Sequence, residues 1–325
     1  MQSLTKTMNI EKLEPHLVGA NISLRHPSPG CSVYQIKDDS GSMEMTIYDV
    51  FPGICLIYND VHIPRCGIAV DHAVGNFIEI EHCREGRIAC RDGDHYFCLT
   101  QGDISIRKGS GTGRALEFPL SHYHGLAILI DLDKIPKCLG CLLDGVDIEP
   151  AALVEKFRLD VHHHIALRQL PNIEHIFSEL YTVPESVRKG YHKVKVLEIL
   201  LFLSALEPLG EAQPRSHYSR KQVNLAKAVA AHLAEHLHDN LTIEELASHF
   251  DTSPTNLKAS FRGVYGISVQ SYQREQKMRA AARLLLTTSM SVQEVSGEFG
   301  YANSSKFSAA FQRVMGMTPN KYRLQ

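Results

Sequence analysis

The sequence lacks any long apolar run of the kind that crosses a membrane. The longest apolar stretch in its second half, residues 196–206, is interrupted by Glu198 and Ser204. That stretch is too short and too polar to span a bilayer, because a transmembrane helix takes about 20 apolar residues. Residues 1–14 also lack the apolar core of a signal peptide. The sequence therefore predicts a cytoplasmic protein with no membrane partner.

Motifs for several classes of chemistry are also missing. The sequence has no glycine-rich phosphate loop, no nucleophile elbow and no paired-carboxylate motif. Its eight cysteines all lie between Cys31 and Cys141, and the pair Cys138-x-x-Cys141 has no second CxxC to complete a zinc site. We expect reduced, structural thiols, with metal or redox sensing as the alternative. The sequence thus predicts neither an enzyme nor a cofactor.

Charge is distributed unevenly along the 325 residues, a length that suggests two domains. The net charge of −2 conceals a basic C-terminal part, because residues 215–325 hold 14 Lys and Arg against 8 Asp and Glu. The rest of the chain holds 20 against 28. A basic module beside an acidic one is typical of nucleic-acid binding by the basic module alone, although a solvated surface would give the same count.

The basic part contains one structural unit written twice. Apolar side chains recur at i, i+3, i+4 and i+7 in residues 243–250, which predicts a short amphipathic helix. The same spacing returns 49 residues later in residues 292–299, where serine takes one apolar position. Each of these helices opens with a capping box, formed by Thr242 with Glu245 and by Ser291 with Glu294.

A second helix follows a tight turn in each copy. In the first copy Ser253 is a good N-cap and Pro254 suits the first helical position. In the second copy Gly300 can adopt the positive φ that the turn needs. Two short helices around such a turn predict a helix-turn-helix motif, at residues 241–262 and 291–313, with an ordinary helical bundle as the alternative.

The segment between the copies reads as one helix over residues 269–286. A helix of about 20 residues spans roughly 30 Å. Successive major grooves on one face of DNA lie roughly 34 Å apart. Such a connector can therefore hold two recognition helices in adjacent grooves. It also carries basic residues that could meet phosphates, namely Arg274, Lys277, Arg279 and Arg283.

The second copy carries a signature that resembles a known family. It reads Gly300-Tyr301-x-x-x-Ser305-x-Phe307-x-x-x-Phe311-x-x-x-x-Gly316-x-Thr318-Pro319-x-x-Tyr322-Arg323. This pattern is similar to that of AraC/XylS-type transcription regulators, and the resemblance covers about the last hundred residues. Details around Leu257-Lys258 and Asn303 are most similar to the PchR-like branch of that family.

The resemblance implies a sequence-specific DNA-binding regulator, most simply an activator. Its partners would be double-stranded promoter DNA, RNA polymerase, a small-molecule effector and a second copy of the chain in a homodimer. The sequence names neither the effector nor the target genes.

The N-terminal half reads as β-structure. Residues 43–60 alternate apolar and polar side chains around a turn at Pro52-Gly53, which predicts a hairpin. Short strands follow over residues 76–131, separated by expected turns at Glu85-Gly86, Asp92-Gly93 and Gly102-Asp103. This spacing is typical of a sandwich or a small barrel. In front of an AraC-type module, the resemblance favours a cupin-like β-barrel.

These patterns predict an α+β chain of two domains. Residues 1–148 would form a cupin-like sensing domain, led by a polar, partly helical segment over residues 1–25. Trailing helices over 149–206 would connect or dimerise, because their apolar face must pack on the barrel or on a second subunit. A linker over 207–220 would precede an all-α, AraC-type DNA-binding domain over 221–325 with two helix-turn-helix motifs.

The outward faces of the second helices are the candidate DNA-reading surfaces. Lysine and asparagine can read guanine and adenine edges, and serine and threonine bind bases or phosphates. Arg262 and Arg313 lie late on their helices and would hold phosphates, since phosphate contacts position a protein on DNA. The predicted DNA-binding residues are Thr255, Asn256, Lys258, Arg262, Ser304, Ser305, Lys306, Ser308, Gln312 and Arg313.

Two alanines complicate this interface. Ala259 and Ala309 stand where many members of the resembling family carry arginine, the residue that most often contacts guanine. Lys258 and Lys306 therefore become the leading candidates for base recognition. Exposure to solvent alone is the alternative for each residue.

The stretch His122-Tyr123-His124 is the candidate effector pocket. In a strand, His122 and His124 point to one face and can bind one metal ion. Residues 125–129, however, lack the glutamate that a cupin metal site carries three or four positions further on. We therefore predict a polar pocket lining without metal, with an ordinary surface pair of histidines as the alternative. The consecutive histidines 162–164 would point in different directions and are expected at the surface.

Three hypotheses follow for the whole chain. The first is a regulator whose N-terminal domain binds a small-molecule effector. The second is a regulator whose N-terminal half only dimerises or binds a protein partner. A cupin-type metalloenzyme is the third and least favoured, because the metal-binding carboxylate is missing.

Overall fold

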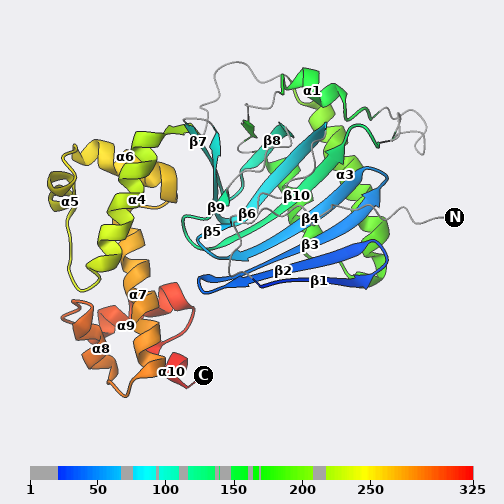
Figure 1. The fold of residues 1–325 in the computed structure, drawn as a ribbon. Coiled ribbons are helices and arrows are strands. Elements are labelled where there is room, and N and C mark those ends of the chain that lie inside the picture. The colour runs from blue at the N-terminus through cyan, green and yellow to red at the C-terminus, as the bar shows by residue number, and fades with distance from the viewer. Residues whose placement is uncertain are drawn as a thin grey trace. The chain divides into compact units, whose positions relative to one another are not determined.

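A computed structural model describes residues 21–66, 76–92, 95–109, 116–135, 139, 148–159, 164–167, 170–207 and 217–324 (Figure 1). The chain divides into two compact units, residues 1–217 and 218–325. The first unit combines a curled antiparallel sheet with helices, and the second is helical, which confirms the predicted α+β class with two domains. Residues 208–216 of the expected linker lie outside the described residues.

Antiparallel strands build the first unit. They are β1 Asn21–Ser28, β2 Cys31–Asp38, β3 Gly41–Phe51, β4 Ile54–His62, β5 Arg65–Cys66, β6 Phe77–Asp92, β7 His95–Thr100, β8 Ile104–Gly109, β9 Leu116–Glu117, β10 Tyr123–Asp131 and β11 His164–Leu167. The main path runs β1-β2-β3-β4-β10-β6, and the sheet curls along it (Figure 1). Among the described strands β1 pairs only with β2, so the expected barrel is a half-barrel with an open edge.

Strand β6 corrects one predicted turn. Glu85-Gly86 does not end a strand, because β6 runs without a break from Phe77 to Asp92. Gly86 has a φ of +81° there, and the register with β10 shifts at His124/Gly125. A bulge of this kind bends a strand and increases its twist. The first part of β6 consequently pairs with β8 and the second part with β7.

Other expectations for this unit have mixed outcomes. The predicted hairpin over residues 43–60 is confirmed by the antiparallel pair β3 and β4. The prediction of a polar, partly helical segment over residues 1–25 was wrong for its last residues, because β1 begins at Asn21. The helical region after Glu149 also contains an unexpected strand, β11, which pairs with β8.

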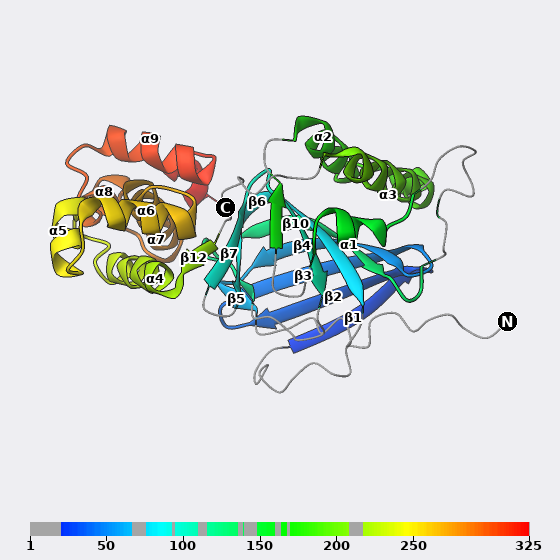
Figure 2. The ribbon, with the colours of Figure 1, turned by 90° about the horizontal axis from the view of Figure 1, so that it is seen from above.

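Helices cover one face of the sheet (Figure 2). They are α1 Ala152–Lys156, α2 Pro171–Leu180, the 3₁₀ turn η3 Glu185–Val187 and α3 Arg188–Ala205. Leu56 and Ile128 of the sheet share one core with Phe177 of α2 and Ile199 of α3. Because side chains alternate along a strand, the neighbours Ile57 and Ala127 instead join a second core on the other face. The trailing helices thus pack on the sheet, as one of the two alternatives predicted.

The second unit contains every helix that the sequence predicts. After the short strand β12 His217–Ser219, the helices are α4 Arg220–Glu235, α5 Ile243–His249, α6 Pro254–Tyr265, α7 Val269–Thr287, α8 Val292–Glu298, α9 Ser304–Met315 and α10 Pro319–Arg323. Helix α4 starts at Arg220, because Ser219 and Gln222 form a further capping box. No described helix in either unit is long and apolar enough to cross a membrane.

Candidate nucleic-acid interface and interior cavity

Both helix-turn-helix copies have the predicted local geometry. The capping boxes of α5 and α8 are formed on both sides, by side-chain and backbone bonds. The turns repeat one hydrogen bond: Thr252 N–H donates to the Ala247 carbonyl at 2.9 Å, and Tyr301 N–H donates to the Ser296 carbonyl at 3.0 Å. Gly300 has a φ of +74° in its turn. These local signals fix where each second helix begins.

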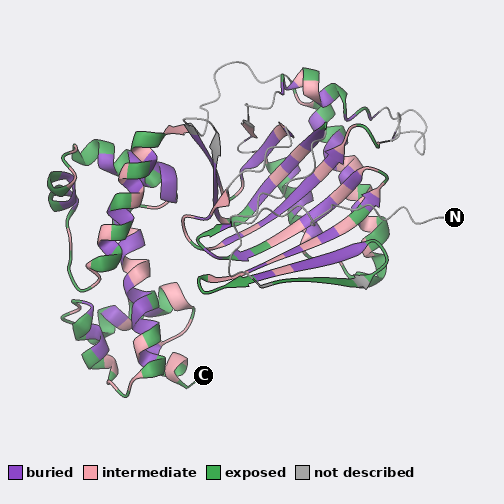
Figure 3. Ribbon diagram, in the orientation of Figure 1, coloured by how far each residue is buried: buried purple, intermediate pink, exposed green. Residues whose placement is uncertain are grey.

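The second helices, α6 and α9, bury one face and expose the other (Figure 3). Leu257 and Phe261 of α6, and Phe307 and Phe311 of α9, are fully buried, as the helical period predicts. The outward positions are exposed except Ser308, which is half-buried. They are Thr255, Asn256, Lys258, Ala259, Arg262, Ser304, Ser305, Lys306, Ala309, Gln312 and Arg313. The structure gathers these residues on two polar helix faces, and their contact with DNA stays a prediction.

Caps already use part of this polar surface. Asn303 accepts hydrogen bonds from the backbone N–H groups of Ser305, at 2.8 Å, and Lys306, at 3.2 Å. The Asn256 amide donates to the Thr252 hydroxyl at 2.9 Å, so a base contact by Asn256 would compete with that bond. Lys258 and Lys306 are exposed as Asn256 is, but within the described part of the chain neither amine makes a hydrogen bond or an ion pair. This difference favours the lysines as readers of base edges.

Helix α7 joins the two copies through a buried amine. Lys277 is 3% exposed, and its Nζ donates to Asn240 Oδ1 at 2.7 Å and to the Phe299 carbonyl at 3.1 Å. Burial lowers the pKa of Lys277. Lys277 therefore bonds the turn before α5 to the end of α8. The expectation that it meets phosphate was wrong.

The remaining cations of α7 have different surroundings. Arg279 pairs with Glu275 at 2.7 Å, which offsets its charge. Arg283 is exposed and Arg274 is half-buried. Fewer side chains of α7 are thus free to meet phosphates than its composition suggests.

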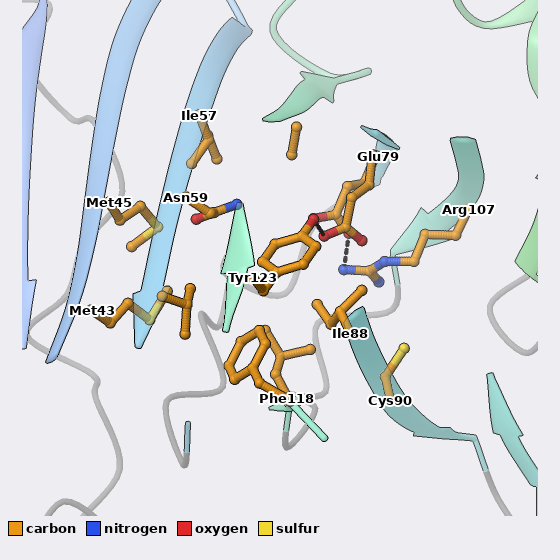
Figure 4. Close-up of a pocket in the computed structure, with 14 residues that line it drawn as sticks. Met43, Met45, Ile57, Asn59, Glu79, Ile88, Cys90, Arg107, Phe118 and Tyr123 are labelled. Carbon is orange, nitrogen blue, oxygen red and sulfur yellow. Dashed lines mark hydrogen bonds and ion pairs between the residues drawn. The ribbon is translucent and has the colours of Figure 1, made fainter. Parts of the chain in front are cut away.

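A cavity of about 80 Å³ lies on the concave side of the sheet (Figure 4). A cavity needs at least about 10–15 Å³ to hold one water, so this cavity has room for several waters or a small ligand. Its apolar lining includes Met43, Met45, Ile57, Val61, Ile88, Cys90, Leu116, Phe118 and Ala127. Its polar lining comprises Asn59, Glu79, Glu81, Arg107 and Tyr123.

Paired charges form the polar end of this cavity. Arg107 and Glu79 make an ion pair. The Tyr123 hydroxyl donates to Glu81 Oε1 at 2.8 Å (Figure 4). Burial, reinforced by the neighbouring Glu79, raises the pKa of Glu81 to about 7. A carboxyl group that changes charge near neutral pH therefore sits beside a fixed cation in an apolar surrounding.

The predicted pocket residues separate in the structure. Tyr123 lines the cavity, whereas His122 and His124 are not among its lining residues and lie beside His62. Sequence reasoning missed Glu79 and Glu81. Their alternation with isoleucine in Phe77-Ile78-Glu79-Ile80-Glu81 was the available signal, because period-2 spacing sends both carboxylates to one face.

Cysteine and histidine clusters of the sequence are described in part. Six cysteines are described as free thiols and five of these are buried, as structural thiols would be. Cys138 and Cys141 lie outside the described residues, as do residues 162–163 of the histidine run. His164 begins β11.

Comparisons with known proteins point to the C-terminal unit. Residues 246–325 match a family described as a helix-turn-helix domain. The chain is 26% identical over 170 residues to the arabinose operon regulatory protein of Escherichia coli (strain K12), covering 51% of this chain and 54% of that protein. It thus spans about half the length of that relative.

Two further proteins are similar to this chain, one over most of its length and one over its C-terminal part. The chain is 24% identical over 286 residues to the HTH-type transcriptional regulator ExsA of Pseudomonas aeruginosa, covering 81% of this chain and 90% of that one. The solved C-terminal domain of AraT, a response regulator from Geobacillus stearothermophilus, is 31% identical, covers 30% of this chain and 83% of that domain, and has a TM-score of 0.30. The PchR-like branch stays a prediction. Residues 246–325, which hold the signature read from the sequence, match a helix-turn-helix domain family, and the chain is similar to transcription regulators that include the arabinose operon regulatory protein.

Proposed function

We propose that the chain is a cytoplasmic, sequence-specific transcription regulator, most simply an activator, that binds double-stranded promoter DNA. The observation that carries this proposal is the pair of capped helix-turn-helix copies, each with an exposed polar face on its second helix. RNA polymerase is the partner that an activator would recruit. The proposed regulator performs no chemistry on its ligands.

On the two second helices, the lysines and the arginines have different roles in this proposal. Lys258 and Lys306 read base edges, because an exposed amine can donate to the O6 and N7 atoms of guanine. Arg262 and Arg313 hold phosphates and set the orientation on the duplex. Helix α7 has 19 residues, which corresponds to about 28 Å at 1.5 Å per residue. This length suits two helices in successive grooves, roughly 34 Å apart.

The concave cavity is the proposed effector site. Binding pockets are mostly apolar with a few convergent polar groups, and Glu81, Arg107 and Tyr123 are such groups here. The ion pair of Arg107 with Glu79 could open to meet a charged effector. An effector would therefore be a small molecule with an apolar body and a polar or charged end. His122 and His124 are less suited to this role than Tyr123, because they do not line the cavity.

Helix α3 is the proposed homodimer contact. Val187, just before it, and Val194 and Leu201 within it are exposed, by 52%, 61% and 42%, although the opposite face packs on the sheet. These residues are seven positions apart, the spacing with which helices pair in coiled coils. Such a stripe also suits the alternative function, in which the N-terminal half only dimerises or binds a protein partner.

A genome-wide map of bound DNA tests the proposed function. We expect specific sites upstream of genes whose transcripts change when the gene for this protein is deleted. Transport or catabolic genes beside those sites would indicate the chemical class of the effector. A folded protein that occupies no specific sites, with or without candidate effectors, would contradict the proposal.

A further inference from the structure

Three histidines of the first unit meet at one end of the sheet. His62 ends β4, His124 is the second residue of β10, and His122 lies just before that strand. One ring nitrogen from each lies within 4.8 Å of those of the other two. Ring centroids are 5.4 Å apart for His62 and His122, 5.3 Å for His62 and His124, and 4.6 Å for His122 and His124. We call these residues the His62 cluster.

The His62 cluster is separate from the effector cavity. Side chains alternate along a strand, so His124 shares the face of β10 that carries Leu126 and Ile128 in the helix-covered core. On β4, His62 likewise shares a face with Leu56 of that core. Tyr123, between His122 and His124, points the other way and lines the cavity. A ligand of the cluster would therefore not occupy the effector site.

Backbone contacts hold two of the histidines in place. A Cβ atom on Gly41 would lie 2.0 Å from the His62 carbonyl oxygen, and one on Gly86 would lie 2.1 Å from the His122 carbonyl oxygen. Only glycine permits these close approaches. Ser121, which precedes His122, has a φ of +52°, a conformation that non-glycine residues rarely adopt. The backbone positions of His62 and His122 are thus set by neighbouring strands.

Two carboxylates face the imidazoles. Asp60 Oδ1 lies 2.8 Å from His62 Nε2 and 3.2 Å from His124 Nε2, and the pairing of β4 with β10 places Asp60 opposite His124. Glu85 Oε1 lies 3.2 Å from His122 Nε2. Such carboxylates supply the negative charge that balances a cation and orient its imidazole ligands. The group therefore offers three nitrogen donors and at least one oxygen donor.

We propose that the His62 cluster binds one divalent transition-metal ion of the zinc class, with His62, His122 and His124 as ligands and Asp60 as the fourth donor. Imidazole binds zinc at about 2.0–2.1 Å, which puts the donors of a tetrahedral site about 3.3 Å apart. The side chains of His62, His122 and His124 are 51%, 25% and 31% exposed, so small rotations can close this distance. Magnesium and calcium prefer all-oxygen sites and do not suit this donor set.

Calorimetric titration of the full, metal-free chain with zinc chloride tests the proposal. A second group, His232, Glu235 and His236, lies in the other unit and could also bind zinc. All measurements therefore use a background with His232→Asn and His236→Asn. In this background we expect one zinc ion per chain. Cobalt(II) bound to the same protein should show the visible absorption of a tetrahedral site.

Matched variants assign the ion to the cluster. The double variant His62→Asn/His124→Asn should lose more affinity than the roughly 10–100-fold that removal of an outer-shell partner costs. His175→Asn is the control, since His175 is an exposed histidine on α2 that also pairs with a glutamate, at 3.2 Å. It should bind zinc as the background protein does.

Two results would overturn the proposal. The first is that the background protein, folded by circular dichroism, takes up no zinc at micromolar concentrations. The second is that the His62→Asn/His124→Asn variant keeps its stoichiometry and affinity. Neither result depends on DNA binding, so these measurements test the proposed metal site independently of the proposed regulatory function.

Discussion

The two helix-turn-helix copies share a pattern but differ in how much of each second helix is covered. Helix α6 buries six residues, whereas α9 buries only Phe307 and Phe311. Helix α4, with 16 residues, packs against α6. Helix α9 packs against α7, against α8 and against α10, which has only five residues. One sequence signature thus sets the turn and the inner face of both copies, while the flanking segments decide how much of each second helix stays exposed.

One aligned position shows the difference directly. Gly263 of α6 corresponds to Arg313 of α9, 50 residues later. A Cβ atom on Gly263 would lie 2.3 Å from the ring of Tyr218, so the first copy has room only for glycine there. Arg313 is exposed. At this position the second copy therefore exposes a charged side chain, whereas the first copy is covered by the ring of Tyr218.

The two lysines proposed to read bases also differ in position. Lys258 of α6 aligns with Ser308 of α9, and Lys306 of α9 aligns with Asn256 of α6. When the two copies are aligned, the lysines thus lie about half a helical turn apart, since one turn takes 3.6 residues. We infer that the two copies would read different base sequences rather than two copies of one half-site.

The largest expected effect is loss of a core ring in either copy. Phe261→Ala should cost about 3–5 kcal/mol, because a fully buried phenylalanine leaves a cavity that the surroundings cannot fill. Phe311→Ala should cost less, since α9 is less completely covered and can adjust. Hydrogen exchange of α6 and α9 in the full chain measures both. Equal losses of stability in the two variants would show that α9 is covered as completely as α6.

Substitutions at the aligned positions Gly263 and Arg313 should have a smaller effect on stability, and that effect should differ between the two copies. Gly263→Arg should destabilise the second unit by about 1–3 kcal/mol or more, because the side chain collides with Tyr218. Arg313→Ala should leave stability within about 0.5 kcal/mol, as for other exposed sites. Chemical denaturation compares the two variants with the parent. A well-tolerated Gly263→Arg would show that the N-terminal segment does not cover α6 in solution.

Removing a phosphate contact should weaken binding without changing sequence preference. Arg262→Ala and Arg313→Ala should each reduce affinity for all DNA sequences alike, and each should lower the salt dependence of binding by about one ion. Fluorescence anisotropy over a range of salt concentrations measures this slope. A change in preferred sequence with an unchanged slope would instead assign the arginine to base reading.

The smallest expected effect is a pH dependence of the stability of the first unit, which should leave both helix-turn-helix copies unchanged. Glu81 has a pKa raised to about 7, so the folded chain keeps a proton that the unfolded chain loses near its ordinary value of 4.5. Stability should therefore fall as pH rises from about 4.5 to 7, and Glu81→Gln should flatten that fall. Denaturation followed by hydrogen exchange resolves the units. Identical pH profiles for parent and variant would contradict a buried, protonated Glu81.

Local signals explain why the helical unit was predictable. The capping residues Thr242, Ser253 and Ser291 and the turn at Gly300 act within a few positions of themselves, and each is formed as expected. Lys277 was misread because α7 is buried on several sides, so a helical period alone does not tell which cation faces solvent.

Long-range pairing explains what could not be predicted in the sheet. His62 meets His124 because β4 pairs with β10, across about 60 residues of sequence. Glu85-Gly86 has the composition of a turn, yet pairing of β6 with β10 keeps the strand continuous. The cavity likewise combines residues of several strands, and only the alternation of Glu79 and Glu81 with isoleucine marked it in the sequence.

Selection of DNA from a randomised pool by the full chain tests most directly whether both copies read DNA. The proposed function predicts a recovered site with two different segments about one helical turn, or 10–10.5 base pairs, apart. Lys258→Ala should relax the preference in one segment and Lys306→Ala in the other. A folded protein that enriches no sequence, or two variants that alter the same segment, would contradict recognition by two distinct copies.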